Sequence, residues 1–208
     1  SGRDEQALAI CREFIQQHPD SKWTPDVMFW MAKYDYNQGA YESAEKQSLL
    51  LAEKYRSSPL ADSALLLAGQ SAFKRKEYLR AVDLLTKMVK DYPASRHLAE
   101  ARFAQADALS ELANYPAAIL IYEEIIKIPD SELIPAAWCR KGDCQFTLGA
   151  DNPKRYEEAI ESYRVVVNSS ASGLDLAIQA NCKIGRCLEK LGRAGEAFEQ
   201  YYLKVIVP

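Results

Sequence analysis

Histidine is scarce in this chain of 208 residues, and the two copies, His18 and His97, lie far apart. Neither stands in a metal-ligating spacing such as H-E-x-x-H, so we expect no metal site. No glycine-rich loop follows a strand pattern, and Gly192-Arg193-Ala194-Gly195 has the composition of a turn between helices. Carboxylate pairs such as Glu123-Glu124 lie on faces expected to be solvated, without an apolar pocket to raise their pKa for acid–base work. We therefore expect no catalytic residue and no cofactor.

The chain also lacks an excess of charge of either sign and any long apolar run. Its 26 basic and 29 acidic side chains leave a formal net charge of -3, which gives no basic surface for nucleic acid. No stretch approaches the run of about 20 apolar residues that a membrane span needs. The chain opens without methionine and stops just after an expected helix, so we expect it to be part of a longer protein.

What the sequence does contain is an alanine that recurs at a nearly fixed interval. The steps are 37 residues through Ala7, Ala44, Ala81 and Ala118, and then 41 and 38 residues to Ala159 and Ala197. A tyrosine three positions earlier and a bulky residue four positions later accompany most of these alanines. Self-similarity at this period indicates stacked supersecondary units rather than a closed globule.

Each repeat is predicted to be an antiparallel helical hairpin. In residues 58–95, small and apolar residues follow helical spacing up to Ala72, and a second stripe runs from Tyr78 to Val89. Tyr92-Pro93 ends the second helix, because proline cannot continue a helix and restricts the residue before it. We expect Ser95 to cap the following helix.

Small residues recur at one place in the first helix of each hairpin, namely Ala32, Gly69, Ala106, Gly142 and Gly185. A glycine inside a helix costs about 1 kcal/mol against alanine, so we expect close packing against the recurring alanine to offset that cost. Thr24-Pro25 is expected to start a helix, with the threonine as its cap.

The predicted fold class is an all-α solenoid of about 11 helices that forms one domain over residues 1–208. A lone second helix near 4–17 is followed by hairpins at about 24–55, 59–91, 96–128, 132–168 and 174–206. The turn from Gly149 to Arg155 is longer than the others, which is expected of a tolerated surface loop or of an insertion that serves binding.

Five cysteines are an odd number, so a complete disulfide framework is excluded. Cys139 and Cys144, like Cys182 and Cys187, are five residues apart, which places them about 140° apart around a helix. Neither pair can clamp one metal ion or close a disulfide without unwinding its helix. Cys139 and Cys182 occupy equivalent places in successive hairpins, so a redox or metal role stays open beside plain packing.

At these residues the chain resembles the tetratricopeptide repeat (TPR) family over essentially its whole length. The resemblance is carried by Trp138 with Gly142, by Gly69, by the Tyr-x-x-Ala openings and by Tyr92-Pro93. The Tyr-Pro-x-Ser junction and a period above the family's usual value of about 34 are similar to bacterial cell-envelope members, of the Tol-Pal coordinator and outer-membrane assembly lipoprotein types. This resemblance implies a periplasmic or outer-membrane-associated location, with the cytoplasm as the alternative that free thiols favour.

The resemblance implies a right-handed superhelix whose concave wall, lined by the first helices, binds a peptide or protein partner without catalysis. Carried onto this chain, the groove-facing residues are Phe29, Lys33, Tyr36, Leu66, Gln70, Phe73, Phe103, Asp107, Ser110, Cys139, Asp143, Phe146, Cys182, Arg186 and Glu189. Aromatic anchors flanked by polar groups are typical of protein-binding surfaces, and packing in the solenoid core is the alternative for each ring. The lysine-and-asparagine clamp with which chaperone-binding relatives hold a C-terminal carboxylate is not present at these places.

Two other functions stay open at this stage. The chain is alternatively a structural spacer or oligomerisation segment, in which its ends or convex face matter, or a regulatory repeat domain of a larger cytoplasmic protein. The sequence leaves the oligomeric state open.

Overall fold

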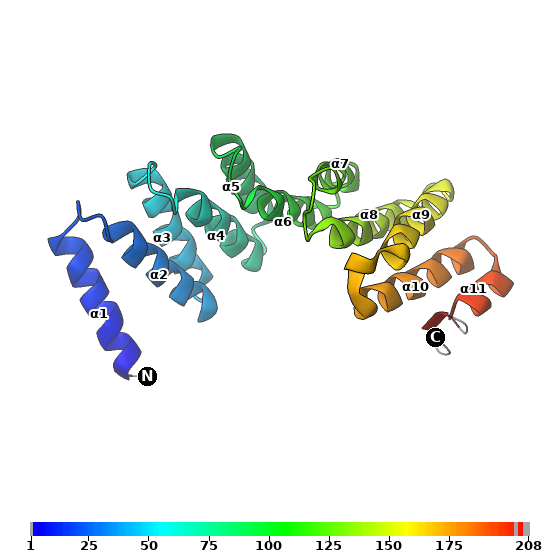
Figure 1. The fold of residues 1–208 in the computed structure, drawn as a ribbon, viewed down its shortest axis with the longest axis horizontal. Helices are drawn as coiled ribbons and strands as arrows, with labels where there is room; N and C mark the ends of the chain where they lie inside the picture. Colours follow the sequence, from blue (N-terminus) through cyan, green and yellow to red (C-terminus); the bar gives the residue numbers. More distant parts are fainter. Residues whose placement is uncertain (1, 202–203, 206–208) are drawn as a thin grey trace. The chain divides into compact units, whose positions relative to one another are not determined.

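The computed structural model describes residues 2–201 and 204–205. This described part contains α-helices, one short 3₁₀-helix and no strand, so the predicted all-α class is confirmed (Figure 1). The helices are α1 (Gly2–Gln17), α2 (Thr24–Asn37), α3 (Tyr41–Lys54), α4 (Ala61–Lys74), α5 (Tyr78–Asp91), α6 (Leu98–Glu111), α7 (Tyr115–Ile126), α8 (Ile134–Leu148), α9 (Lys154–Asn168), η1 (Ser170–Ser172), α10 (Gly173–Lys190) and α11 (Ala194–Tyr201).

The chain divides into two compact units, residues 1–104 and 105–208, with the boundary inside α6. In the N-terminal unit each helix from α1 to α5 packs on the next, and α2 also contacts α4. In the C-terminal unit each helix from α7 to α11 packs on the next, and α8 also contacts α10. Such nearest-neighbour stacking is that of a helical solenoid. A single solenoid over 1–208 stays a prediction, and the expected end of the last hairpin at 206 lies outside the described residues.

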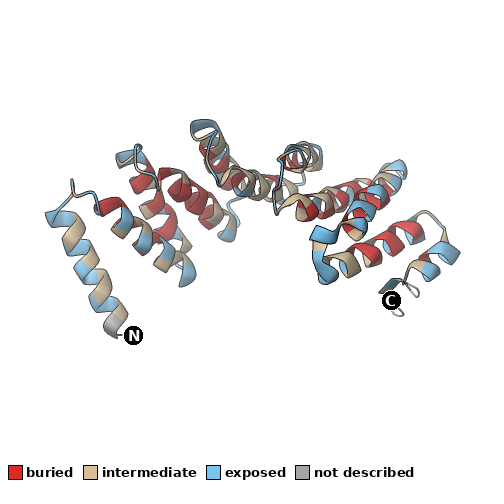
Figure 2. Ribbon diagram, viewed as in Figure 1, coloured by how far each residue is buried: buried red, intermediate tan, exposed pale blue. Residues whose placement is uncertain are grey.

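The recurring alanine lies in the tight contact between the two helices of each hairpin. Ala44, Ala81, Ala118 and Ala159 have no exposed surface, and Ala197 is 2% exposed. Ala7 is only half-buried, and its helix α1 packs against α2. Figure 2 shows the buried residues on the helix sides turned to neighbours, with none on the described part of α1.

The small residue of the first helix makes room for the bulky residue that follows the alanine. A Cβ atom on Gly142 would lie 2.5 Å from the ring of Tyr163, and one on Gly69 would lie 2.5 Å from Cγ of Leu85. The same arrangement recurs at Gly185. The predicted close approach is therefore confirmed, but the side chain that the glycine admits is the bulky one four positions after the alanine.

The junction serines close turns ahead of the helices instead of capping them. The hydroxyl oxygen of Ser95 accepts a hydrogen bond from the backbone N–H of His97 at 3.0 Å, and α6 begins only at Leu98. The same bond to the second following residue is made by Ser21, Ser58 and Ser131. These are serine turns, in which the hydroxyl replaces a backbone carbonyl, so the predicted cap at Ser95 is wrong.

Helix α2 begins at Thr24 with Pro25 in its first turn, as predicted. The threonine does not cap the helix, because its side chain is buried and its hydroxyl donates to the carbonyl oxygen of His18 at 2.6 Å. Thr24 therefore ties α2 to the end of α1.

The hairpin of α8 and α9 has a long turn, and an aromatic ring from each helix still meets the other beside that turn. The rings of Phe146 and Tyr156 meet edge-on, with centroids 5.3 Å apart and planes at 64°. Phe73 and Tyr78 meet with the same centroid distance of 5.3 Å, although only five residues separate them. Residues 150–154 are exposed and absorb the extra length, and a binding role for this turn stays a prediction.

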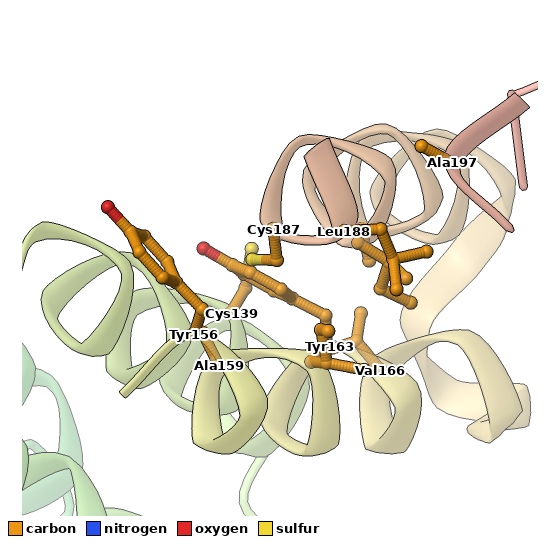
Figure 3. Close-up of a cluster of buried hydrophobic side chains, with 11 residues drawn as sticks. Cys139, Tyr156, Ala159, Tyr163, Val166, Cys187, Leu188 and Ala197 are labelled. Atoms are coloured by element: carbon orange, nitrogen blue, oxygen red, sulfur yellow. The ribbon is translucent and has the colours of Figure 1, made fainter. Parts of the chain in front are cut away.

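All five cysteines are free thiols. Cys139 and Cys187 belong to the hydrophobic cluster of the C-terminal unit that surrounds Tyr163 (Figure 3). Burial raises the pKa of the Cys139 and Cys144 thiols, and it raises that of Cys187 to about 12. Within the described residues no group of three His, Cys, Asp or Glu side chains is placed to hold a metal ion. The burial of Cys139, Cys144 and Cys187 therefore agrees with the interpretation of these thiols as packing residues.

This burial predicts selective alkylation of the native protein. Iodoacetamide at pH 8 should modify the half-buried Cys11 and Cys182 first, whereas Cys187 should resist. A thiol with a pKa of about 12 carries roughly one thiolate in ten thousand at pH 8, and burial also blocks the reagent. Peptide mass spectrometry after timed quenching measures the order, and an unfolded control in urea should show no such order. Early modification of Cys187 in the native protein would contradict the packing.

Candidate partner-binding site

A pocket of about 150 Å³ lies in the C-terminal unit between α8, α9 and α10. Its lining consists of Asp143, Phe146, Thr147, Tyr163, Lys183 and Arg186. Three of these six, on two different helices, belong to the residues predicted from the sequence to face the groove. Two hollows in the N-terminal unit, at the α2–α3 turn and at the α5–α6 junction, contain none of the predicted residues.

The carboxylate of Asp143 is held at the pocket wall by two neighbours. Its Oδ1 accepts hydrogen bonds from the Tyr163 hydroxyl at 2.8 Å and from Lys183 Nζ at 2.7 Å. Its Oδ2 accepts a second bond from Lys183 Nζ at 2.9 Å. The ammonium group of Lys183 also lies 5.6 Å from the centroid of the Tyr163 ring and 3.4 Å from Cys139 Sγ. Asp143 and Lys183 thus neutralise each other.

We use the term rung for an aspartate that accepts a hydrogen bond from a tyrosine hydroxyl and pairs with a cation. A second rung occurs one hairpin earlier. Asp107 of α6 accepts from the Tyr122 hydroxyl at 2.6 Å and pairs with Arg140 Nε at 3.5 Å. In both rungs the aspartate follows the small residue of its first helix. The tyrosine is the bulky residue facing that small residue, and the cation comes from the next first helix. The repeat pattern therefore builds both rungs.

In the last described hairpin, an arginine occupies the position that the aspartate has in the two rungs. Arg186 follows Gly185 as Asp143 follows Gly142. Its guanidinium lies over the Phe146 ring, 5.3 Å from the centroid, and the side chain is exposed. Within the described part of the chain no carboxylate lies in ion-pair distance of Arg186.

Burial sets the protonation of the rungs. It raises the pKa of Tyr122 and Tyr163 far above the ordinary value, and the neighbouring carboxylates raise it further. Both hydroxyls therefore remain donors. Burial also raises the pKa of Asp107, although the Tyr122 hydrogen bond and Arg140 act in the opposite direction.

The raised pKa of Asp107 predicts a pH-dependent contribution to stability. The folded state binds this proton more tightly than the unfolded state, so the stability from Asp107 grows as the pH falls and is lost as the pH rises through the folded pKa. The free energy of unfolding of the wild type, relative to Asp107→Asn, should therefore shift in favour of the wild type between pH 7 and pH 4. Urea unfolding of both proteins at several pH values measures this difference, and a pH-independent difference would contradict the burial of the carboxyl.

The predicted groove residues of the N-terminal unit have separate surroundings. Lys33 is exposed over the Phe29 ring, with Nζ 5.8 Å from the centroid. Gln70 donates to Glu100 at 2.9 Å. Leu66 is 5% exposed, so it offers a partner almost no surface.

The remaining predicted residues fall into two groups. Tyr36 and Phe73 are half-buried in edge-on ring pairs within their hairpins, and Phe103 is also half-buried. The others lie in the C-terminal unit: Ser110 in contact with Cys144, Cys139 buried, Cys182 half-buried and Glu189 exposed.

Sequence reasoning missed three pocket residues, Thr147, Tyr163 and Lys183. The sequence pattern marks Tyr163 only as the bulky residue four positions after Ala159, although the aspartate beside Gly142 signals a partner for its hydroxyl. Lys183 occupies the place in α10 that Arg140 occupies in α8, three residues before the position of Arg186 and Asp143. That equivalence was the available signal.

These features define a helical-repeat protein with a polar, aromatic pocket between α8, α9 and α10. Two family models described as tetratricopeptide repeat match the chain, one at residues 1–21 and 63–95 and the other at residues 103–174. Together they cover more than half of it, and the chain belongs to the tetratricopeptide repeat family.

Solved structures of this fold resemble the chain at low sequence identity. A MamA protein has a TM-score of 0.69 and 19% identity, with 88% of this chain and 90% of that chain covered. MamA from Desulfovibrio magneticus RS-1 has a TM-score of 0.68 and 18% identity, with 86% and 91% covered. A Podosopora anserina protein, described as a kinesin light chain with nearly identical TPR-like repeats, has a TM-score of 0.70 and 14% identity, with 88% and 94% covered. No curated protein matches the sequence significantly. These likenesses concern the fold.

Proposed function

We propose that this chain is a non-catalytic interaction module that holds a peptide or protein partner at the pocket of α8, α9 and α10. Tetratricopeptide repeats generally mediate protein–protein interaction, and none of the described helices is long and apolar enough to cross a membrane. The observation that carries the proposal is the convergence of Asp143, Phe146 and Arg186 on one pocket. An aromatic ring flanked by an arginine is the kind of anchor on which protein interfaces depend.

The setting that we propose for this module is a bacterial envelope assembly. This part of the proposal rests on the sequence alone, namely on the Tyr-Pro-x-Ser junction and the 37-residue step between the recurring alanines. The spacer and the cytoplasmic regulatory domain remain the alternatives, and neither requires an occupied pocket.

Site-specific photo-crosslinking tests the binding site. A benzophenone amino acid at Thr147, an exposed position on the pocket wall, should crosslink to a protein partner in an extract of the source cells. The same group at Glu161, an exposed position of α9 that does not line the pocket, should not. Crosslinking from Glu161 alone would reject the pocket as the binding site. Circular dichroism of both variants confirms that they are folded.

A further inference from the structure

The pocket carries one cation more than its own carboxylate neutralises. Lys183 and Arg186 face a single acid, Asp143, and both oxygens of that acid are bonded to Lys183. On the neighbouring helix face Arg140 is shared between Asp107 at 3.5 Å and Asp143 at 3.8 Å. The exposed Glu189 interacts with Tyr201, and Arg186 has no ion-paired carboxylate among the described residues. Arg186 is therefore the cation of this pocket that has no ion-pair partner among the described residues.

The guanidinium of Arg186 lies over the ring of Phe146 and makes no hydrogen bond to the described residues. Cζ of Arg186 lies 5.3 Å from the ring centroid, and a cation–π contact of this kind uses none of the five N–H donors of the guanidinium. Phe146 is in turn fixed by the edge-on contact with Tyr156, at 5.3 Å between centroids. Gly149 leaves room for the Tyr156 ring. The arginine is thus preorganised, which lowers the entropic cost of binding.

The group that fits a free, planar guanidinium edge is a carboxylate, because two parallel N–H donors match its two oxygens. The lining residues all lie within helices, where the backbone N–H groups are already bonded, so the pocket offers side-chain donors only. A volume of about 150 Å³ suits one side chain and is small for a cofactor or drug-sized ligand. A single uncompensated arginine also suits one negative charge better than the two of a phosphate group.

We propose that the pocket binds the side-chain carboxylate of an Asp or Glu within a partner segment, with Arg186 as its counter-ion and Phe146 as the residue that positions Arg186. This inference rests on the proposed function and adds the chemistry of the partner to it. It differs from the capture of a chain terminus, because the carboxylate comes from the middle of the bound segment.

Two matched peptide libraries test this inference on the whole chain. Both contain 12-residue peptides that are acetylated and amidated, with the central residue fixed as Glu in one library and Gln in the other. The best Glu peptide should bind at least about tenfold more tightly than its Gln twin in fluorescence anisotropy, as expected for a charge-assisted hydrogen-bonded pair. Arg186→Ala should abolish this difference. Phe146→Leu, which keeps the arginine but removes the ring under it, should reduce it about threefold.

Two further variants separate charge recognition from loss of structure. Arg164→Ala removes an exposed arginine of α9 that pairs with Glu161, and it should leave the Glu preference unchanged. Asp143→Asn frees Lys183 from its carboxylate, so it should increase the affinity for the Glu peptide, whereas a structural defect would decrease it.

Three results would overturn the inference. Equal binding of the Glu and Gln twins would remove the carboxylate from recognition while leaving the binding function in place. A preference that appears only in peptides with a free C-terminus would assign the carboxylate to the chain end. Failure of both libraries to bind would reject a short acidic segment, and crosslinking from Thr147 would then decide separately whether the pocket still holds a protein.

Discussion

Replacement of Gly142 by valine is expected to lower the free energy of unfolding by about 3 kcal/mol. A Cβ atom at this position would lie 2.5, 2.8 and 2.9 Å from three ring atoms of Tyr163. The ring is buried, and its hydroxyl is bonded to Asp143, so it cannot move aside without breaking that bond. The midpoint of thermal unfolding, followed by circular dichroism at 222 nm, should fall by about 6–12 °C.

Gly195 provides the control for this substitution. It lies in α11, and a Cβ atom there would meet nothing within 4 Å. Gly195→Ala should therefore stabilise the protein by a few tenths of a kcal/mol up to about 1 kcal/mol, through the better helix propensity of alanine. A Gly142→Val protein as stable as the wild type would show that Tyr163 does not lie over this glycine.

The second large effect is expected at Glu45 in the N-terminal unit. This α3 residue is 6% exposed and pairs with Arg75 Nη1 at 2.9 Å and Arg80 Nε at 3.2 Å. The Arg75→Ala/Arg80→Ala double variant leaves the carboxylate buried and unpaired, which should cost about 3 kcal/mol. Glu45→Ala alone should cost less, because both arginine side chains keep access to water.

A mutant cycle checks the cause of that loss. Adding Glu45→Ala to the double variant removes the unpaired charge, so it should recover most of the lost stability. Urea unfolding of the four proteins measures the cycle. A triple variant that is less stable than the double variant would show that packing, not the unpaired carboxylate, causes the loss.

The hairpins were readable from the sequence because their signals are local. The recurring alanine and the Pro-Ser junctions lie within a few residues of the contacts and turns that they predict. The functions of the serines were not readable, since a serine three residues before a helix and one at its cap look alike in a sequence. Ser95 is the example: it closes a turn, and the helix begins three residues later.

The pocket was readable only in part. The resemblance to the tetratricopeptide repeat family placed Asp143, Phe146 and Arg186 on the groove wall without showing which of them meet. Lys183 and Tyr163 reach Asp143 across 40 and 20 residues of chain, and the long turn after Gly149 changes that spacing. A contact between helices of this kind depends on how each helix is rotated, and the sequence period does not fix that rotation closely enough.

The rungs account for the charged groups that lie beside the proposed binding pocket. Asp107 and Asp143 are each satisfied by a tyrosine and a cation from neighbouring helices, so they hold the first helices in register. Arg186 stands where the next aspartate would stand, and it has no ion-paired carboxylate among the described residues. We propose that the same repeat position serves structure in two hairpins and recognition in the third.

The most direct test of the proposed binding site is a nuclear magnetic resonance titration of the whole 23.4 kDa chain with the partner segment recovered by crosslinking. Backbone amide signals of Phe146, Thr147, Lys183 and Arg186 should shift with one common affinity, and those of Glu161 and Arg164 on α9 should not. Shifts confined to the α9 residues, or spread along the second helices without the pocket residues, would contradict the assignment of the pocket as the partner-binding site.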